Sequence, residues 1–347
     1  MNILLITAHS IAAYDDVRML SDLGHQVFNL DGYIDPSRPH VDMRPALPDV
    51  IRQPELMAVV DGLGTRDNLT AAKERIPDEL LEWADVAIFH HYLDRWFMPN
   101  STRLARADVR VIWRTCGQSD FNLEDRMEPY RLGGQVSIVR YSPAEQRFFE
   151  GTGHWAGQDA LIRFGKYLGD YPEWTGPAEN GPAFIANVTQ DMAGRGEHCG
   201  LTFWIRATRG LTALPAGKDS EKLPGGVGFL PEPDMLDYLR QASAYLYTGT
   251  VPASYTLGLM EALLVGVPVV SIGPDAWAGP GALFEGHDLA FPLVADTPEL
   301  ARDMLRRLIE DRPYAAMVSA EQRLRAQALF DVAVVGKQWQ KLLEGES

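Results

Sequence analysis

Cysteine is nearly absent from this chain, and so is any excess of positive charge. The 347 residues include only Cys116 and Cys199, whose wide separation fits neither a disulfide framework nor a zinc cluster. We therefore expect a reducing, cytoplasmic setting. The 47 acidic and 32 basic residues give a formal net charge of −15, which disfavours nucleic acid and anionic membrane surfaces as partners.

A hydrophobic run long enough to cross a membrane is also absent. The best candidate, residues 257–272, is interrupted by Glu261, Gly266 and Pro268, so we expect no membrane span. The opening residues MNILLITAH contain no basic leader and only a short apolar run, Ile3–Ile6. They predict a buried first strand and not a signal peptide.

Several common active-site motifs are missing as well. The sequence contains no H-E-x-x-H, C-x-x-C or Walker A pattern, and Gly62-Leu63-Gly64 lacks the third glycine of a dinucleotide-binding loop. The stretch from Gly117 to Phe121 has phenylalanine where a hydrolase nucleophile elbow requires glycine. We therefore expect no metal site and no dinucleotide cofactor, and hydrolase chemistry is disfavoured.

What the sequence does contain is an alternation of strands and helices in each half. At about 100–200 residues per domain, the length suggests two domains. In the first half the predicted strands are 2–7, 26–30, 85–89, 109–113 and 136–140, with a helix over 15–23. In the second half they are 183–187, 212–214, 227–230, 244–248 and 267–272, with helices over 234–242, 256–265, 298–311 and 315–343. This pattern predicts an α/β protein with two doubly wound parallel sheets, connected through the glycine- and proline-rich segment 165–182.

The most informative segment is Ala244–Gly273, where a strand, a loop and a helix follow one another. Ser254 and Thr256 are suitable helix N-cap residues, and backbone N–H groups at such a helix start bind phosphate oxygens. Glu261 lies one to two turns further along, where its carboxylate can accept hydrogen bonds from a ribose diol. The alternative is an ordinary capped helix with a solvated glutamate.

The order of residues in this segment resembles the donor-site signature of retaining glycosyltransferases of the GT-B fold, of the family-4 type (glycosyl transferases group 1). The signature (F/Y)-G-L-x-x-x-E-A-x-x-x-G-x-P-V-V is similar to Tyr255-Thr256-Leu257, Glu261-Ala262, Gly266 and Pro268-Val269-Val270. The chain departs from the family pattern at Ala253, where a glutamate is usual, and at Thr256, where a glycine is usual.

Other parts of the chain resemble the same family in the same order. Leu23–Val27 resembles the segment that leads into the second strand, and Arg195-Gly196 resembles the basic pair that grips the donor diphosphate. Phe330-Asp331-Val332 resembles the motif before a last helix that crosses back onto the first domain. The resemblance implies two Rossmann-like domains facing a cleft: an acceptor domain over 1–163, a nucleotide-sugar domain over 164–322, and a returning helix over 323–347.

The resemblance also implies a function and a set of site residues. The implied reaction moves a sugar from a nucleotide-diphosphate sugar, UDP-sugar favoured, to a hydroxyl acceptor, with retention and without a metal or other cofactor. The absence of a D-x-D triplet agrees with metal independence. The catalytic candidates are Arg195, Lys218 and His91; the two cations would stabilise the leaving diphosphate, and the alternative for each is a surface charge. The donor-binding candidates are Ser10, Arg195, Lys218, Phe229, Leu230, Pro231, Tyr255, Thr256, Leu257 and Glu261.

Acceptor-binding candidates follow the predicted strands of the first domain. They are His9, His90, His91, Arg114 and Gln118. Relatives often have His-Gly where this chain has Cys116-Gly117, so we expect His90 or His91 to take over a sugar contact. The alternative is that the histidine pair caps a strand end or packs against Trp96 and Phe97. For Arg114, the alternative is a structural ion pair with Asp120 or Glu124.

Two other functions stay open at this stage. The replacements at Ala253 and Cys116 favour a catalytically weak or inactive GT-B protein that binds a nucleotide sugar or a partner. A GT-B-type sugar epimerase is the second alternative. A small molecule, a protein or a saccharide fits the composition as acceptor, nucleic acid fits it less well, and the sequence does not indicate an oligomeric state.

Overall fold

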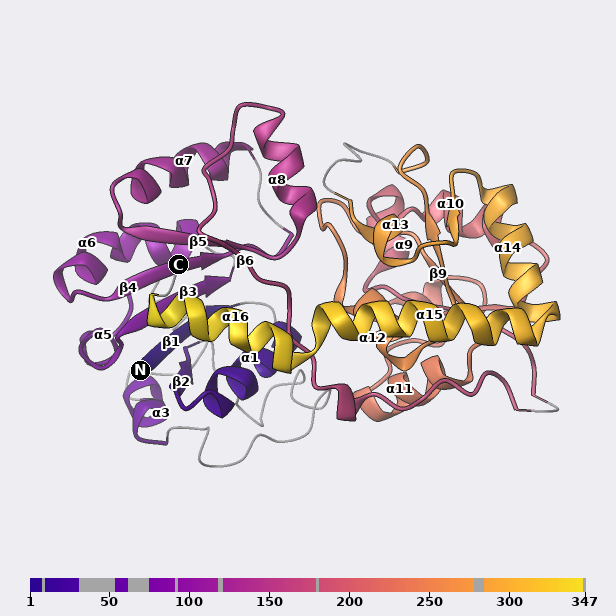
Figure 1. Cartoon of the computed structure of the whole chain (residues 1–347), viewed down its shortest axis with the longest axis horizontal. Helices are drawn as coiled ribbons and strands as arrows, with labels where there is room; N and C mark the ends of the chain where they lie inside the picture. Colours follow the sequence, from indigo (N-terminus) through magenta and orange to yellow (C-terminus); the bar gives the residue numbers. More distant parts are fainter. Residues whose placement is uncertain are drawn as a thin grey trace. The chain divides into compact units, whose positions relative to one another are not determined.

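The computed structural model describes residues 1–7, 10–30, 54–61, 75–90, 93–117, 121–178, 181–277 and 284–345. These residues form two compact units, each built on its own parallel sheet (Figure 1). The first unit comprises Met1–Tyr141, Phe149–Gly165 and Val332–Ser347, and the second comprises Ser142–Phe148 and Lys166–Asp331.

The sheet of the first unit has the strand order β2-β1-β3-β4-β5-β6, and every pairing in it is parallel. Its strands are β1 (Asn2–Thr7), β2 (Gln26–Asn29), β3 (Val86–His90), β4 (Arg110–Arg114), β5 (Val136–Arg140) and β6 (Ala160–Leu161). Its helices are α1 (Ser10–Asp22), α3 (Pro54–Asp61), α5 (Asp78–Trp83), α6 (Met98–Arg106), α7 (Phe121–Leu132) and α16 (Val332–Glu344). The helix α8 (Pro143–Glu150) begins in the second unit and ends in the first. The predicted doubly wound architecture is confirmed.

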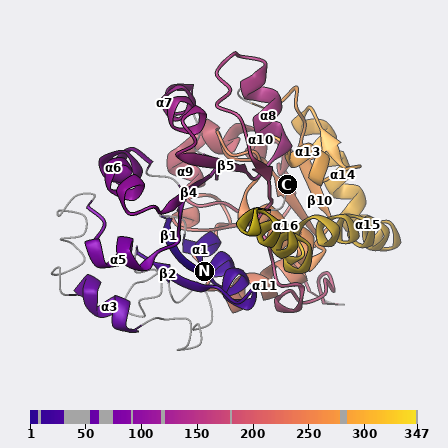
Figure 2. The ribbon, with the colours of Figure 1, turned by 60° about the vertical axis from the view of Figure 1, so that its left-hand side comes forward.

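Alternate residues of each strand enter separate cores on the two faces of this sheet. Leu4 and Ile6 of β1 pack with residues of α5, α6 and α7, whereas Ile3 and Leu5 pack with α1 and α16. The period-2 alternation of strand side chains produces this division. Figures 1 and 2 show α16 beside α1 on the second face. The last helix therefore belongs to the first unit.

The sheet of the second unit has the order β11-β10-β9-β7-β8 and is also parallel. Its strands are β7 (Ile185–Val188), β8 (Ala213–Ala216), β9 (Ala244–Tyr247), β10 (Val269–Ile272) and β11 (Val294–Ala295). Its helices are α9 (Met192–Arg195), α10 (Leu201–Ala207), α11 (Glu232–Gln241), α12 (Leu257–Val265), α13 (Gly286–Leu289), α14 (Pro298–Glu310) and α15 (Arg312–Phe330).

The strand predicted over 227–230 is wrong. The segment forms a single bridge, between Gly228 and Ala216 of β8. Gly225 and Gly228 have φ angles of +75° and +81°, a left-handed backbone that cannot continue a strand. The segment is an irregular loop that touches the edge of the sheet at one point.

The helix α12 is buried along almost its whole length, because it is apolar on every side apart from Glu261. It packs against α11 and α15, and its residues from Leu259 to Val265 are all buried. A helix that is hydrophobic all round is found in the core of a protein. Glu261 is therefore buried because the apolar residues around it on α12 are buried.

The glycine- and proline-rich segment predicted as a connection packs closely on the second unit. The indole N–H of Trp174 donates to the carbonyl of Ala242 at 2.7 Å, and its backbone N–H donates to Val265 at 2.9 Å. Apart from the segment 142–148, which belongs to the second unit, the chain passes between the units at Gly165 to Lys166 and at Asp331 to Val332; the boundaries expected from the sequence were near 163 and 322. The second crossing comes later because α15 packs along α12 as far as Phe330.

Within the described part of the chain, no helix combines the length and the apolar character that a membrane span requires.

Candidate functional site

The strand order of the second unit reverses direction between β7 and β9. The chain runs from β7 outward to β8, then returns to the other side of β7 and continues through β9, β10 and β11. In open α/β sheets, ligands bind at the carboxyl ends of the strands on either side of such a switch point. The loops that follow β7, β8 and β9 therefore form the candidate ligand site of this unit.

Two of these loops are joined by hydrogen bonds that bring the predicted cations onto neighbouring segments. The backbone N–H of Asp191, after β7, donates to the carbonyl of Lys218, after β8, at 2.8 Å. The N–H of Lys218 in turn donates to the side-chain oxygen of Gln190 at 2.8 Å. Arg195 ends the short helix α9 that begins directly after Asp191, and it is half-buried, whereas Lys218 is exposed.

The loop after β9 joins the same group of segments. The hydroxyl of Thr248 donates to the carbonyl of Cys199 at 2.6 Å, and the backbone N–H of Val251 donates to the backbone carbonyl of His198 at 2.7 Å. Burial raises the pKa of the Cys199 thiol, and the nearby positive charge of Arg195 opposes that shift. We call residues 189–199, 217–219 and 248–256 the loop cluster. It gathers segments from three strand ends around the switch point.

The helix α12 starts at the edge of the loop cluster, and Thr256 is its N-cap. The Thr256 side chain accepts a hydrogen bond from the N–H of Leu259 at 3.3 Å. The N–H groups of the first turn have no acceptor within the helix, which makes such a terminus suitable for an anion. Ser254, the other predicted cap, is buried, and so is Tyr255, whose ring lies 5.6 Å from that of Phe330.

Gly258 allows α12 to begin directly against the end of β7. A Cβ atom added at Gly258 would lie 2.9 Å from the carbonyl oxygen of Val188, the last residue of β7. The same Val188 donates its N–H to the hydroxyl of Tyr245 in β9 at 3.0 Å, which ties the two switch-point strands together. Sequence reasoning missed Gly258; the available signal was a glycine in the first turn of an otherwise apolar helix.

Glu261 is not the solvated glutamate of the alternative interpretation. Its side chain is 3% exposed, and its Oε1 atom lies 3.6 Å from the Nζ atom of Lys166, which is 0% exposed. Two buried charges at this separation compensate each other, and either one alone would be costly in a low-dielectric interior. Lys166 was not predicted, because its only sequence signal is its position beside Gly165 in an irregular segment.

The segment from Phe229 to Pro231 lies next to the loop that carries Lys218. The N–H of Gly217 donates to the carbonyl of Gly228 at 2.9 Å, which holds this segment against the end of β8. The Phe229 side chain is 44% exposed, and Pro231 is the N-cap residue of α11. The segments of Arg195, Lys218 and Phe229–Pro231 and the start of α12 thus lie at the carboxyl ends of β7, β8 and β9, with Glu261 one turn further along α12.

In the first unit, His90 and Arg114 form a buried cluster with Asp16 of α1. The Asp16 carboxylate lies 3.2 Å from Nε2 of His90 and 3.5 Å from a guanidinium nitrogen of Arg114. Burial lowers the pKa of His90, and Asp16 opposes that shift. His90 and Arg114 end β3 and β4, so the cluster lies at the carboxyl edge of this sheet.

The contacts of Arg114 favour the structural alternative over an acceptor contact. Its guanidinium is buried between the rings of Phe164 and Trp339, 4.6 and 4.9 Å from their centroids, and it donates to the carbonyl of Arg163 at 3.0 Å. Its ion-pair partner is Asp16. Glu124, which the sequence offered as a partner, instead binds Arg140 through two hydrogen bonds of 2.8 and 2.7 Å.

Some predicted residues fall outside the part of the chain that the structure describes. These are His9, His91 and Gln118, together with Asp120, the other suggested partner of Arg114. Ser10 is the first residue of α1, and its side chain is outside the description as well. Of the five acceptor-binding candidates, the structure therefore describes only His90 and Arg114.

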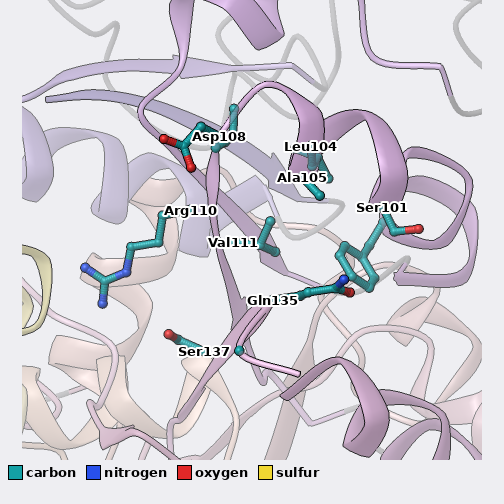
Figure 3. Close-up of a pocket in the computed structure, with 11 residues that line it drawn as sticks. Ser101, Leu104, Ala105, Asp108, Arg110, Val111, Gln135 and Ser137 are labelled. Carbon is teal, nitrogen blue, oxygen red and sulfur yellow. The ribbon is translucent and has the colours of Figure 1, made fainter. Parts of the chain in front are cut away.

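A pocket of about 360 Å³ lies in the first unit, at the amino ends of β4 and β5. Figure 3 shows Arg110, Val111 and Ser137 of these strands lining it, with Leu104 and Ala105 of α6 above. It is at the opposite strand ends from His90 and Arg114 and contains none of the predicted site residues. Among the described residues, no group of histidine, cysteine, aspartate or glutamate side chains is arranged to hold a metal ion.

Comparison with known proteins identifies the fold. No model of a protein family matches the chain, and no curated protein matches its sequence. Among solved structures, HepE of Anabaena in complex with UDP and glucose is similar with a TM-score of 0.66 and 14% identity, over 99% of this chain and 100% of that one. A glycosyltransferase from Rickettsia africae is similar with a TM-score of 0.64 and 10% identity, over 99% and 98% of the chains.

A third similar structure is an O-GlcNAc transferase from Thermobaculum terrenum, with a TM-score of 0.60 and 12% identity, over 100% of this chain and 67% of that one. These similarities extend over both units. They establish that the chain has the GT-B fold, as the sequence resemblance predicted.

Proposed function

We propose that this protein is a glycosyltransferase that moves a sugar from a nucleotide-diphosphate sugar to a hydroxyl group. The observation that carries the proposal is the loop cluster of the second unit. It places the loops of Arg195 and Lys218 beside the first turn of α12 at a switch point, where α/β sheets bind ligands. The UDP and glucose bound by HepE support a UDP-sugar as the donor.

The chemistry asks the second unit to stabilise a diphosphate leaving group. As the bond between the sugar and the diphosphate breaks, negative charge grows on the phosphate oxygens. Arg195, Lys218 and the N–H groups of Leu257 and Gly258 are the positive groups that would receive it. We propose that these groups do the work without a metal ion, and that Glu261 accepts hydrogen bonds from the ribose diol.

We propose that the first unit binds the acceptor and that the reaction proceeds with retention. The carboxyl edge of the first sheet, where His90 ends β3, is the equivalent switch point in that unit. The net charge of −15 favours a small molecule, a saccharide or a protein as acceptor over nucleic acid. The cysteine content supports a cytoplasmic location.

The alternative function is a GT-B protein that binds a nucleotide sugar without transferring the sugar. One observation favours it: position 253, where the family resemblance calls for a glutamate, holds an alanine whose N–H donates to the carbonyl of Thr250 at 2.7 Å. A methyl group cannot contact a sugar hydroxyl as a carboxylate does. Tight UDP binding with no release of UDP from any UDP-sugar would establish this alternative.

The test is the release of UDP from a panel of UDP-sugars, with and without simple sugar acceptors. Arg195→Gln should lower turnover by about 100- to 1,000-fold, the range for loss of one donor to a developing oxyanion, while uridine affinity stays unchanged. Lys218→Gln should act in the same direction. Arg206→Gln is the matched control, because this exposed arginine of α10 pairs with Glu299 outside the loop cluster. Turnover that is equal in Arg195→Gln and wild type contradicts the assignment.

A further inference from the structure

Lys166 is the residue at which the chain enters the second unit again, directly after Gly165 of the first unit, and its backbone is fixed there. Its N–H donates to the carbonyl of Phe330 at 2.6 Å, and it bridges to Asp331, where the chain leaves the second unit again. Phe330 also carries the ring against which Tyr255 packs, one residue before the Thr256 cap. The Lys166 side chain therefore starts from an anchored position next to the beginning of α12.

From this anchor the Lys166 ammonium reaches the Glu261 carboxylate, with 3.6 Å between Nζ and Oε1. Both side chains are buried, yet only Glu261 keeps a trace of exposed surface, at 3% against 0% for Lys166. Of the two side chains, only that of Glu261 therefore reaches the surface, where a ligand can contact it. A carboxylate offers about four lone-pair directions, so an ion pair with Lys166 leaves acceptor capacity for a diol.

The burial of this pair makes each member depend on the other. A buried carboxylate without a positive partner is strongly disfavoured in its charged form and takes up a proton instead. A protonated carboxyl group is a weaker acceptor than a carboxylate and one of its oxygens becomes a donor. The geometry therefore ties the charge of Glu261 to that of Lys166.

We propose that Lys166 is a positioning residue that keeps Glu261 ionised and oriented as the acceptor for the ribose diol, and so makes the nucleotide site selective for ribonucleotides. This inference rests on the proposed function, in which Glu261 binds the donor ribose. It adds that the selectivity is set by a residue that does not touch the nucleotide and that lies at the crossing between the two units.

The experiment measures the affinities of the full-length protein for UDP and for 2′,3′-dideoxy-UDP by calorimetry at pH 7. Wild type should prefer UDP by about 10- to 100-fold, the range for hydrogen bonds to a charged group. Lys166→Met should bring this ratio close to one while the affinity for dideoxy-UDP stays within about twofold.

Two further variants separate positioning from simple damage to the fold. Lys166→Arg keeps the positive charge and should keep most of the preference for UDP. The double variant Lys166→Met/Glu261→Gln holds no unpaired buried charge, so it should fold even where Lys166→Met does not. Its preference should equal that of Glu261→Gln alone, since Lys166 acts only through the carboxylate.

The inference is overturned if Lys166→Met weakens UDP and dideoxy-UDP equally, or if Lys166→Met lowers the preference further in the Glu261→Gln background. Failure of the proposed function gives a different result, because wild-type protein would then bind neither nucleotide or would bind both with equal affinity.

Discussion

Gly258 lies so close to the carbonyl oxygen of Val188 that a Cβ atom at this position would be 2.9 Å from it. This contact sets the start of α12 against the end of β7, at the strand pair where the order of the second sheet reverses. The first turn of α12 therefore starts next to the loop after β7, which carries Arg195 and is hydrogen-bonded to the loop of Lys218. The position of the proposed diphosphate site therefore depends on glycine at position 258, because any larger residue would have a Cβ atom in contact with Val188.

Gly258→Ala should destabilise the second unit and weaken nucleotide binding. Alanine favours a helix over glycine by about 1 kcal/mol, so propensity alone predicts stabilisation. The clash with a backbone oxygen should reverse the sign and cost about 1–3 kcal/mol, as overpacking does. The free energy of unfolding and UDP affinity are the measurements.

Gly169→Ala is the control, because a Cβ atom there meets nothing within 4 Å, and its stability should change by less than about 0.5 kcal/mol. A Gly258→Ala protein as stable as wild type would show that the close contact is not required.

Thr256→Ala should remove the N-cap of α12 and reduce stability by about 1 kcal/mol. It should also weaken UDP binding about five- to tenfold, because the first turn that presents the N–H groups loses its fixed geometry. Thr256→Ser keeps the capping oxygen, so it should keep both the stability and the UDP affinity of wild type.

The matched control for this prediction is Thr297→Ala. Thr297 caps α14 in the same way, accepting from the N–H of Leu300 at 3.1 Å, and α14 is not part of the loop cluster. Thr297→Ala should lose a similar amount of stability and none of the UDP affinity. If both variants lose UDP affinity equally, the start of α12 has no particular role in binding.

The buried cluster of the first unit predicts how stability depends on pH. Burial lowers the pKa of His90 in the folded protein below its value of 6.5 in the unfolded chain. Below pH 6.5 the unfolded chain binds a proton at His90 that the folded protein does not, so the free energy of unfolding should fall as the pH is lowered. The contribution of one histidine is at most about 1.4 kcal/mol per pH unit.

This dependence is measured as the change in Tm between pH 7.5 and 5.5. His90→Gln should lose part of the decrease in Tm that wild type shows. His198→Gln is the control, because this exposed histidine lies outside the buried cluster, and it should keep the full decrease in Tm. An unchanged pH dependence in His90→Gln would contradict the assignment of His90 as a buried neutral side chain.

The sequence predicted the architecture more fully than the contacts of the site. Strands β1 and β5 have the bounds that their short, mainly apolar segments predicted, because a buried strand of a parallel sheet needs such a segment. The predicted strand over 227–230 failed because the apolar residues there are separated by Gly228, whose backbone is left-handed. Local pattern shows the apolar run but not the φ angle that interrupts it.

The contacts of the site join residues that are far apart in the sequence, and no local pattern reveals them. The sequence singled out Glu261, but its partner Lys166 comes from a segment that was interpreted as a connection. In the same way, Arg114 was correctly placed at a strand end, while its partner Asp16 lies on a helix near the start of the chain. Each pair is formed by the packing of distant elements, so it becomes visible only in the folded structure.

The most direct test of the central claim is a thermal-shift panel of UDP, GDP, ADP, TDP and CMP with wild-type protein and Glu261→Ala. A ligand at 100 times its Kd stabilises the folded state by about 2.7 kcal/mol, which gives a clear increase in Tm. We predict a shift with one nucleoside diphosphate, UDP, that is reduced or lost in Glu261→Ala. No shift with any of the five, or a UDP shift of equal size in Glu261→Ala, would contradict a nucleotide site at α12.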